Sequence, residues 1–234
     1  MQSSHSERQK TADFFNRLGT DYISGTKENY AHIYERTNSL VLPHLRGRVL
    51  DLGSGGVDHF DDSVADCWVF CDISKSLLAM HRHSRGRMPV LGEAAWLPFE
   101  SDSFDVVLLS FTLHHFARNR VCTTLQYLRK AFRNMARVCR PGGRLVVVEN
   151  TLQRPFERLQ HVLYPLTVQM LARMRLPPVL LLSEKRIVHM ITEAGFQIRE
   201  STRFTATTKV LILPGTLPRN INPVSICVLA ADRK

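Results

Sequence analysis

Short, continuous apolar runs alternate with segments of helical periodicity along most of the chain. Five runs precede residue 150, at 48–52, 67–72, 88–91, 104–110 and 144–149. Two more follow, near 196–204 and 225–231. Runs of this length without polar alternation are typical of strands that are buried on both faces. The pattern predicts an α/β fold, doubly wound around a mostly parallel seven-stranded sheet.

Three segments between or before these runs carry an apolar stripe at helical spacing. The clearest stripe steps by three and four residues through Val121, Leu125, Leu128, Phe132, Met135 and Cys139. The turn residues 141–143 are expected to end that helix. A second helix is predicted from Ser183 to Gly195, and a third from Lys27 to Pro43. These helices would cover the faces of the sheet.

The order of these elements predicts one domain over residues 1–234. Its parts are an N-terminal helical lid (1–45), a ligand-binding core (46–150), an insertion after the fifth strand (151–182) and the C-terminal part of the sheet (183–234). Ligands of open α/β sheets bind beyond the carboxyl ends of the strands. The insertion is therefore expected to act as a cap over the substrate.

The composition predicts a cellular location and shows that the charge is unevenly distributed along the chain. The five cysteines are scattered and form no C-x-x-C pair, which predicts a reducing, cytoplasmic location, no disulfide and no metal site. The net charge is +10, and residues 117–186 hold 14 Lys and Arg against 3 Asp and Glu. Such a field attracts nucleic acid, anionic lipid or an acidic small molecule, although a solvated basic face gives the same composition.

The most apolar stretch, residues 163–182, is about as long as a membrane span. Gln169, Arg173, Arg175 and a Pro-Pro pair interrupt it, and each arginine in hydrocarbon costs roughly 2.5–3.5 kcal/mol. We expect no transmembrane span, and peripheral membrane contact stays open. The polar N-terminus also predicts no signal peptide.

Candidate chemistry begins at a glycine-rich turn, Gly53–Gly56, which leaves the first strand. Glycine lets a backbone bend sharply and approach a ligand closely. A dinucleotide fingerprint needs a third glycine where Asp58 stands, and an anion there opposes a pyrophosphate. Asp51 instead suits a ligand with an ammonium group, such as the methionine end of S-adenosylmethionine. Asp72, ending the second strand, is placed to accept ribose hydroxyls, or it caps a helix beside Ser74.

Four blocks carry a resemblance to a known family. They are VLDLGSGG (49–56), FCDIS (70–74), GEAAWLPFESDSFDVVLLSFTLHHF (92–116) and RNMARVCRPGGRLVVVEN (133–150), and AGFQIRE (194–200) fits the family's tail. In this order and spacing they resemble the class I S-adenosylmethionine-dependent methyltransferases, type 11 group, which includes enzymes of ubiquinone and menaquinone biosynthesis. The resemblance implies S-adenosyl-L-methionine as cofactor and S-adenosyl-L-homocysteine as product.

The resemblance also implies roles for particular residues. Asp51 and the turn at Gly53, Ser54 and Gly55 would hold the methionine portion. Asp72 would bind the ribose. The adenine would lie against Ile73, Glu93 and the Ala94 amide, and Ser110 and Phe111 would line the sulfonium. Three features depart from the family: Val57 replaces its third glycine, Glu93 replaces its usual aspartate, and residues 57–66 are short and polar for its first helix.

Catalysis and substrate binding rest on residues near the expected cleft. His114 or His115, after the fourth strand, is placed to act as a base, although either could simply pack against the cap. The expected substrate-lining residues are Tyr22, Tyr34, Glu149, His161 and Tyr164, with Tyr30 also in the lid.

The predicted function is methyl transfer to a small-molecule acceptor. The apolar insertion favours an aromatic, natural-product or lipid-like acceptor, and its arginines favour an acidic or carrier-bound one. The basic half suggests RNA methylation as an alternative, but Asn-Pro-Pro-Tyr does not follow the fourth strand and no RNA-platform motif occurs, so nucleic acid is the less favoured partner. A non-catalytic cofactor-binding protein is the third alternative.

Overall fold

The computed structural model describes residues 2–56, 60–81, 86–205 and 223–234, including their side chains except those of 2–8, 20–30 and 62. One seven-stranded sheet has the order β3-β2-β1-β4-β5-β7-β6. Strand β7 is antiparallel to both its neighbours, and the other paired strands are parallel. The predicted mostly parallel seven-stranded sheet is confirmed. The strands are β1 Arg48–Leu52, β2 Cys67–Asp72, β3 Arg87–Leu91, β4 Phe104–Ser110, β5 Cys139–Leu152, β6 Phe196–Phe204 and β7 Val224–Arg233.

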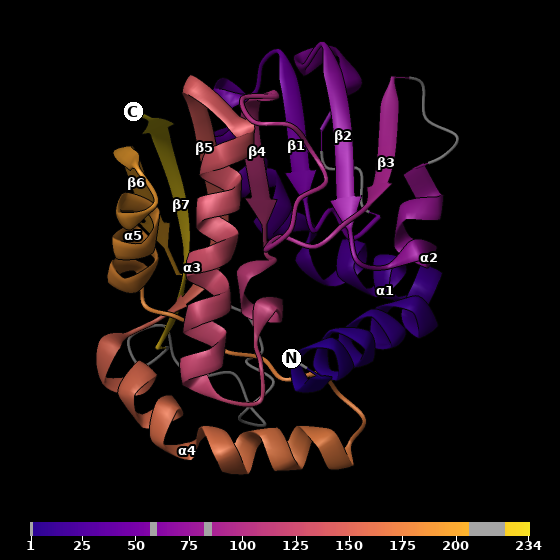
Figure 1. The fold of residues 1–234 in the computed structure, drawn as a ribbon, viewed down its shortest axis with the longest axis vertical. Coiled ribbons are helices and arrows are strands. Elements are labelled where there is room, and N and C mark those ends of the chain that lie inside the picture. The colour runs from indigo at the N-terminus through magenta and orange to yellow at the C-terminus, as the bar shows by residue number, and fades with distance from the viewer. Residues whose placement is uncertain (1, 57–59, 82–85, 206–222) are drawn as a thin grey trace.

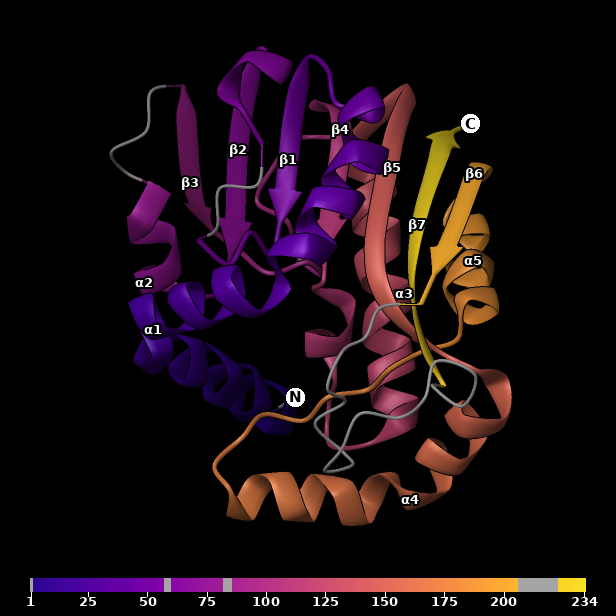
Figure 2. The ribbon, with the colours of Figure 1, turned by 180° about the vertical axis from the view of Figure 1, so that it is seen from behind.

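Helices cover both faces of this sheet. Figure 1 shows α3 and α5 on one face, and Figure 2 shows the second part of α1 on the other. The α-helices are α1 Gln2–Val41, α2 Lys75–Leu78, α3 Val121–Val138, α4 Arg154–Arg173 and α5 Glu184–Glu193. The 3-10 turns are η1 Leu42–His44, η2 Asp62–Val64, η3 Ala79–His81 and η4 Leu113–Phe116.

The continuous apolar strands are explained by burial on both faces. Successive side chains of a strand point to opposite faces of the sheet. Leu50 and Val107 accordingly pack in the core under α3 and α5, whereas Val49 and Val106 pack in the core under α1. Because both faces are covered, neither set alternates with polar residues.

Two boundaries differ from the predictions. Helix α1 begins at Gln2, not Lys27, and bends at Gly19, whose φ of 45° is left-handed. Strand β5 begins at Cys139, not Arg144, although helix α3 ends at Val138, just before the predicted stop at 141–143. The connection from β1 to β2 contains, in its described part, only the turn η2. This agrees with the short polar segment noted there.

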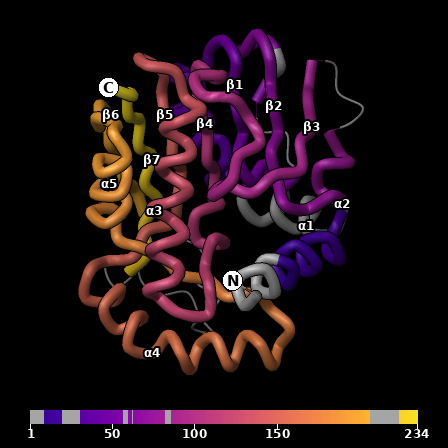
Figure 3. Tube along the Cα trace, viewed as in Figure 1, coloured from indigo at the N-terminus to yellow at the C-terminus, as the bar shows by residue number. Residues whose placement is uncertain are grey.

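The carboxyl ends of β1, β2 and β4 point toward one end of the molecule. The first part of α1 lies at this end, and α4, which follows β5, lies across it (Figures 1 and 3). Asn16 of α1 is fixed there because its Oδ1 accepts hydrogen bonds from Ser74 Oγ at 2.9 Å and Ser76 N at 3.2 Å. No helix in the described part of the chain is long and apolar enough to cross a membrane.

Candidate cofactor site

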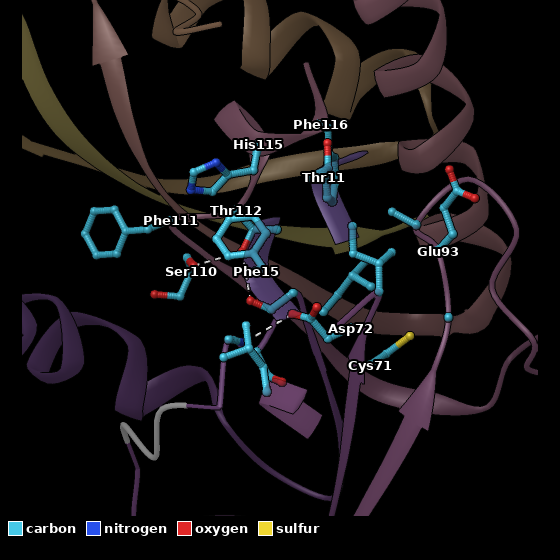
Figure 4. Close-up of a pocket in the computed structure, with 18 of the residues that line it drawn as sticks. Thr11, Phe15, Cys71, Asp72, Glu93, Ser110, Phe111, Thr112, His115 and Phe116 are labelled. Carbon is cyan, nitrogen blue, oxygen red and sulfur yellow. Dashed lines mark hydrogen bonds between the residues drawn. The ribbon is translucent and has the colours of Figure 1, made fainter. Parts of the chain in front are cut away.

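A cavity with about 870 Å³ of empty space, part of it open to solvent, lies beyond the carboxyl ends of β1, β2 and β4. This is the expected ligand position in an open α/β sheet. Helix α1, the turn η4 and helix α3 complete its walls (Figure 4). Its lining residues include Thr11, Phe15, Tyr34, Gly53, Ser54, Gly55, Asp72, Ile73, Glu93, Ala94, Ser110, Phe111, Thr112, His115, Phe116, Arg118 and Tyr127.

The glycine turn is held tightly against the end of β4. Gly53 has a φ of +74° and donates its N–H to the Cys71 carbonyl at 2.7 Å. Thr112 Oγ1 donates to the Gly53 carbonyl at 3.1 Å. A Cβ on Gly53 would lie only 2.2 Å from Thr112 Cγ2. Glycine is therefore required here both by the backbone angle and by the close approach of the two segments.

Asp72 joins the turn to the end of β2. Its Oδ2 accepts the Gly55 N–H at 3.2 Å, and its Oδ1 accepts the Ser74 N–H at 2.8 Å. Burial raises the pKa of this carboxyl above its usual range, and these N–H groups oppose that shift. Each carboxylate oxygen keeps a further acceptor position. The side chain can therefore also accept hydrogen bonds from two neighbouring hydroxyls of a ligand.

A buried ion pair forms the opposite wall. Arg118 Nη2 lies 3.2 Å from Glu93 Oε1, and both side chains are less than a tenth exposed. The Arg118 guanidinium also stacks 3.9 Å from the centre of the Tyr127 ring. Burial and the nearby Glu93 carboxylate raise the pKa of the Tyr127 hydroxyl, so it stays protonated. Glu93, which was expected beside the adenine, therefore forms an ion pair with Arg118 that the sequence did not indicate.

The two adjacent histidines have different environments. His115 lines the cavity, is edge-on to Phe15 with ring centres 5.0 Å apart, and its Nδ1 has no hydrogen-bond partner among the described residues. Burial, and secondarily His114, hold the pKa of His115 well below its usual range. His114 lies outside the lining, and its Nδ1 is 2.7 Å from Glu149 Oε1. Only His115 can thus meet a ligand in the cavity directly.

The end of β4 carries a strained residue. Phe111 has a φ of +51°, which is unfavourable for a side chain with a Cβ. Its N–H donates to the Val148 carbonyl at 2.8 Å, and its ring packs edge-on against Tyr34 at 5.7 Å between centres. These contacts hold the phenyl ring beside α1, where it lines the cavity.

Nine of the ten expected cofactor residues line the cavity. The exception is Asp51, which is buried but not part of the lining. The nine are Gly53, Ser54, Gly55, Asp72, Ile73, Glu93, Ala94, Ser110 and Phe111.

The expected substrate residues mostly lie elsewhere. Tyr34 lines the cavity, whereas Glu149 and His161 do not. Tyr164 is 1% exposed and donates its hydroxyl hydrogen to the Arg118 carbonyl at 2.8 Å, so it supports the wall from behind. The side chain of Tyr22, like that of Tyr30, is outside the described residues.

Several lining residues were not identified from the sequence. Thr11 and Phe15 come from the part of α1 that no apolar stripe revealed, and Tyr127 faces inward from α3. Arg118 was counted only within the basic segment. Cys71 also lines the cavity, but burial raises the pKa of its thiol to about 12, so it is neutral. No group of three metal-ligating side chains occurs among the residues that the structure describes.

Comparison with known proteins agrees with this geometry. Residues 50–147 match the family model described as "Methyltransferase domain". A demethylmenaquinone methyltransferase from Corynebacterium efficiens is 38% identical over 104 residues, or 44% of this chain and 41% of the relative. The chain thus matches about two fifths of that relative's length.

Solved structures share the fold at low sequence identity. The geranyl diphosphate C-methyltransferase from Streptomyces coelicolor A3(2) aligns with a TM-score of 0.69 and 11% identity over 97% of this chain and 98% of its own. The [4+2]-cyclase SpnF aligns with a TM-score of 0.59 and 15% identity over 85% and 80%.

The glycine turn and the acid that ends the next strand, which meet in this cavity, are among the features on which the resemblance to class I S-adenosylmethionine-dependent methyltransferases rests. S-Adenosylmethionine is the cofactor of that class, and the turn and the Asp72 carboxylate fit its amino-acid and ribose parts. Over residues 50–147 the chain is therefore similar to a methyltransferase domain, and over 104 residues it is similar to a demethylmenaquinone methyltransferase.

Proposed function

We propose that this chain transfers a methyl group from S-adenosylmethionine to a small-molecule acceptor. The observation that carries the proposal is the junction of the glycine turn with Asp72, where Gly55 N and Asp72 Oδ2 are 3.2 Å apart in one cavity. When bound, the cofactor supplies an electrophilic methyl group on its sulfonium. Asp72 accepts the ribose hydroxyls, the turn holds the amino-acid portion, and Ile73 and Ala94 flank the adenine.

The acceptor is proposed to be aromatic or lipid-like. Phe15, Phe111, Phe116 and Tyr34 give the cavity an aromatic wall, which favours apolar or planar ligands. The names of the matched proteins point the same way, because one acts on demethylmenaquinone and another on geranyl diphosphate. Neither Arg173 nor Arg175 lines this cavity, so an acidic or carrier-bound acceptor gains no support from them.

His115 is proposed to contact the acceptor and receive its proton. A neutral imidazole at neutral pH has a free acceptor nitrogen, as a base requires. His114 is proposed as a positioning residue, because its bond to Glu149 and the Leu180 N–H bound to its carbonyl at 3.2 Å fix the turn η4. Methyl transfer should therefore fall about a hundredfold or more in His115→Phe, with unchanged affinity for S-adenosylhomocysteine. A rate equal to the parent's would exclude His115 as the base.

The basic segment, residues 117–186, gives RNA methylation little support. Arg137 donates to the carbonyls of Leu97 and Phe99 at 2.9 and 2.7 Å, and Arg129 pairs with Glu193 at 3.3 Å. Arg129 and Arg137 are thus engaged within the protein and less available to phosphates, whereas Arg133 on the same helix is exposed.

Calorimetric titration with S-adenosylhomocysteine tests cofactor binding. Asp72→Ala should weaken it by roughly 1.5–3 kcal/mol, the value of hydrogen bonds to a charged group. Asp66→Ala, an exposed acid six residues earlier, is the matched control and should bind as the parent does. Equal affinity of the Asp72 variant and the parent would remove Asp72 from the site.

Binding alone does not establish transfer, because a [4+2]-cyclase shares the fold. Transfer of a labelled methyl group to a panel of quinone and prenyl acceptors separates the two. Tight binding of S-adenosylhomocysteine without labelling of any acceptor would favour a non-catalytic cofactor-binding protein.

A further inference from the structure

Helix α4 exposes a row of large apolar side chains. Twelve large hydrophobic residues are exposed in the described part of the chain, and seven of them lie on this helix or directly after it. Val162 is 76% exposed and Leu166 is 65% exposed. The seven, named here the α4 face, are Phe156, Leu159, Val162, Leu163, Leu166, Met170 and Met174.

The α4 face lies opposite the side by which the helix packs on the protein. At about 100° per residue, the seven positions fall within an arc of roughly 120°. The buried residues Glu157 and Tyr164 lie on the other side of the helix. A surface helix normally turns its apolar stripe to the core and its polar side to water. Helix α4 presents its apolar stripe outward, which marks a contact surface.

The ends of α4 carry only positive charge on their exposed positions. Arg154 and Arg158 lie in its first turns, Arg173 ends it, and Arg175 follows, all of them exposed. Its one acidic residue, Glu157, is 3% exposed and is neutralised by Arg186 at 2.6 Å. The α4 face is therefore an apolar row between two cationic ends.

We propose that the α4 face lies flat on an anionic lipid bilayer. Such a surface matches both properties, because apolar side chains enter the boundary between head groups and acyl chains while arginines meet the lipid phosphates. A second copy of this chain fits less well. A two-fold axis would set the Arg154 end of one helix beside either the Arg173 end or the Arg154 end of the other, depending on whether the helices pair antiparallel or parallel. Like charges would then meet at both ends.

The surface beside α4 has the same sign of charge. A second cavity, between α1 and the end of α4, is lined by Lys10, Arg17 and Arg175, with Asp13 as its one acid. On the same stretch of α1, Thr11 and Phe15 line the cofactor cavity. The α4 face therefore lies on an element next to the part of α1 that lines the cofactor cavity. The proposal does not depend on methyl transfer.

Flotation of the full chain with lipid vesicles tests this surface. With vesicles of equal parts phosphatidylglycerol and phosphatidylcholine, the parent should float, and Leu159→Gln/Leu166→Gln should bind at least tenfold more weakly. The control is Leu42→Gln/Met88→Gln, which alters two exposed hydrophobic residues far from α4, 40% and 42% exposed, and should float as the parent does. Phosphatidylcholine alone should bind the parent several-fold more weakly.

Two results would overturn the proposal. One is a parent chain that stays with the soluble fraction at every lipid concentration while the melting temperature shows it folded. The other is a parent dimer in sedimentation equilibrium that Leu159→Gln/Leu166→Gln converts to a monomer without a change in vesicle binding. That result would assign the α4 face to a second copy. If the melting temperature of Leu159→Gln/Leu166→Gln equals that of the parent, a loss of flotation is due to the altered surface and not to unfolding.

Discussion

The cofactor cavity and the α4 face differ in what they bury: the cavity buries charged side chains, whereas the α4 face exposes apolar ones. In the cavity, Asp72 is 9% exposed and both its oxygens accept backbone N–H groups. On α4, Leu166 is 65% exposed and its neighbours on that face are apolar too. The cavity is pre-organised for a ligand that it surrounds, and α4 is shaped for a surface that it lies against. The difference shows that a site that encloses a ligand and a surface that meets another surface follow separate physical rules.

The same contrast holds for ion pairs. The pair of Arg118 with Glu93 is buried in the cavity wall, whereas that of Arg129 with Glu193 is more than 40% exposed on both sides. A buried charge that loses its partner is costly, and an exposed one is solvated by water. Stability should therefore respond unequally to the same change at the two arginines.

The largest effect is expected for Arg118→Met. It leaves the Glu93 carboxylate buried without the guanidinium that balances its charge and should lower the free energy of unfolding by about 3–5 kcal/mol. Arg129→Met, the matched change at the exposed pair, should cost no more than about 1 kcal/mol. Urea unfolding of the three proteins measures both. Equal losses would mean that the cavity wall is as well solvated as the outer surface.

The next largest effect is a difference in stability between alanine substitutions at two glycines with similar φ angles. Gly53 and Gly142 have φ values of 74° and 72°, but a Cβ would meet Thr112 only at Gly53 and has nothing within 4 Å at Gly142. Both alanine variants should lose about 1–2 kcal/mol to the left-handed backbone. Gly53→Ala should lose a further 1–3 kcal/mol, roughly, to overpacking.

Thermal unfolding of the two glycine variants gives this difference directly. Thr112→Ser, which removes the Cγ2 atom, should recover part of the loss in the Gly53→Ala background. If both glycine variants melt together, the turn has room that the structure does not show.

The smallest effect is expected for the pH dependence of folding stability that His115 confers. Its pKa is held below 6.5 by burial, so below about pH 6.5 the unfolded chain binds a proton that the folded chain does not. Stability should therefore fall as the pH drops from 6.5 toward the folded pKa, by at most about 1.4 kcal/mol per pH unit for this one group.

His115→Phe should show a smaller fall in melting temperature than the parent between pH 7.5 and 5.5. His189→Phe, at a residue whose side chain is 65% exposed, serves as the control and should behave as the parent does. An unchanged pH dependence in His115→Phe would show that the imidazole is solvated in the folded chain.

The sequence predicted the sheet because its signal is local. Continuous apolar runs and a glycine turn identify buried strands and the ligand end of β1 without knowledge of packing. The start of α1 was missed because residues 2–26 are polar and lack a regular apolar stripe. Strand β5 reaches back to Cys139, which pairs with Phe104 of β4, but the paired register skips residues 140–143, so the turn preference of Pro141 and Gly142 shows as an irregularity in the strand.

The residues of the candidate site also fall into those that a local sequence signal reveals and those that it does not. Nine of the residues expected to bind the cofactor lie in motifs whose spacing marks one edge of the sheet, and they meet in one cavity. Phe15, Arg118 and Tyr127 reach the cavity from helices and turns that carry no motif, so only tertiary packing reveals them. Glu149, at the end of the predicted fifth strand, and His161, in the insertion after it, do not line this cavity, because chain position alone does not determine where a side chain points.

A crystal structure with S-adenosylhomocysteine bound tests the central claim most directly. The account predicts that the ribose hydroxyls lie within hydrogen-bond distance of the Asp72 carboxylate and the homocysteine portion beside Gly53. A ligand bound away from these residues, or a cavity that stays closed at saturating ligand, would contradict it.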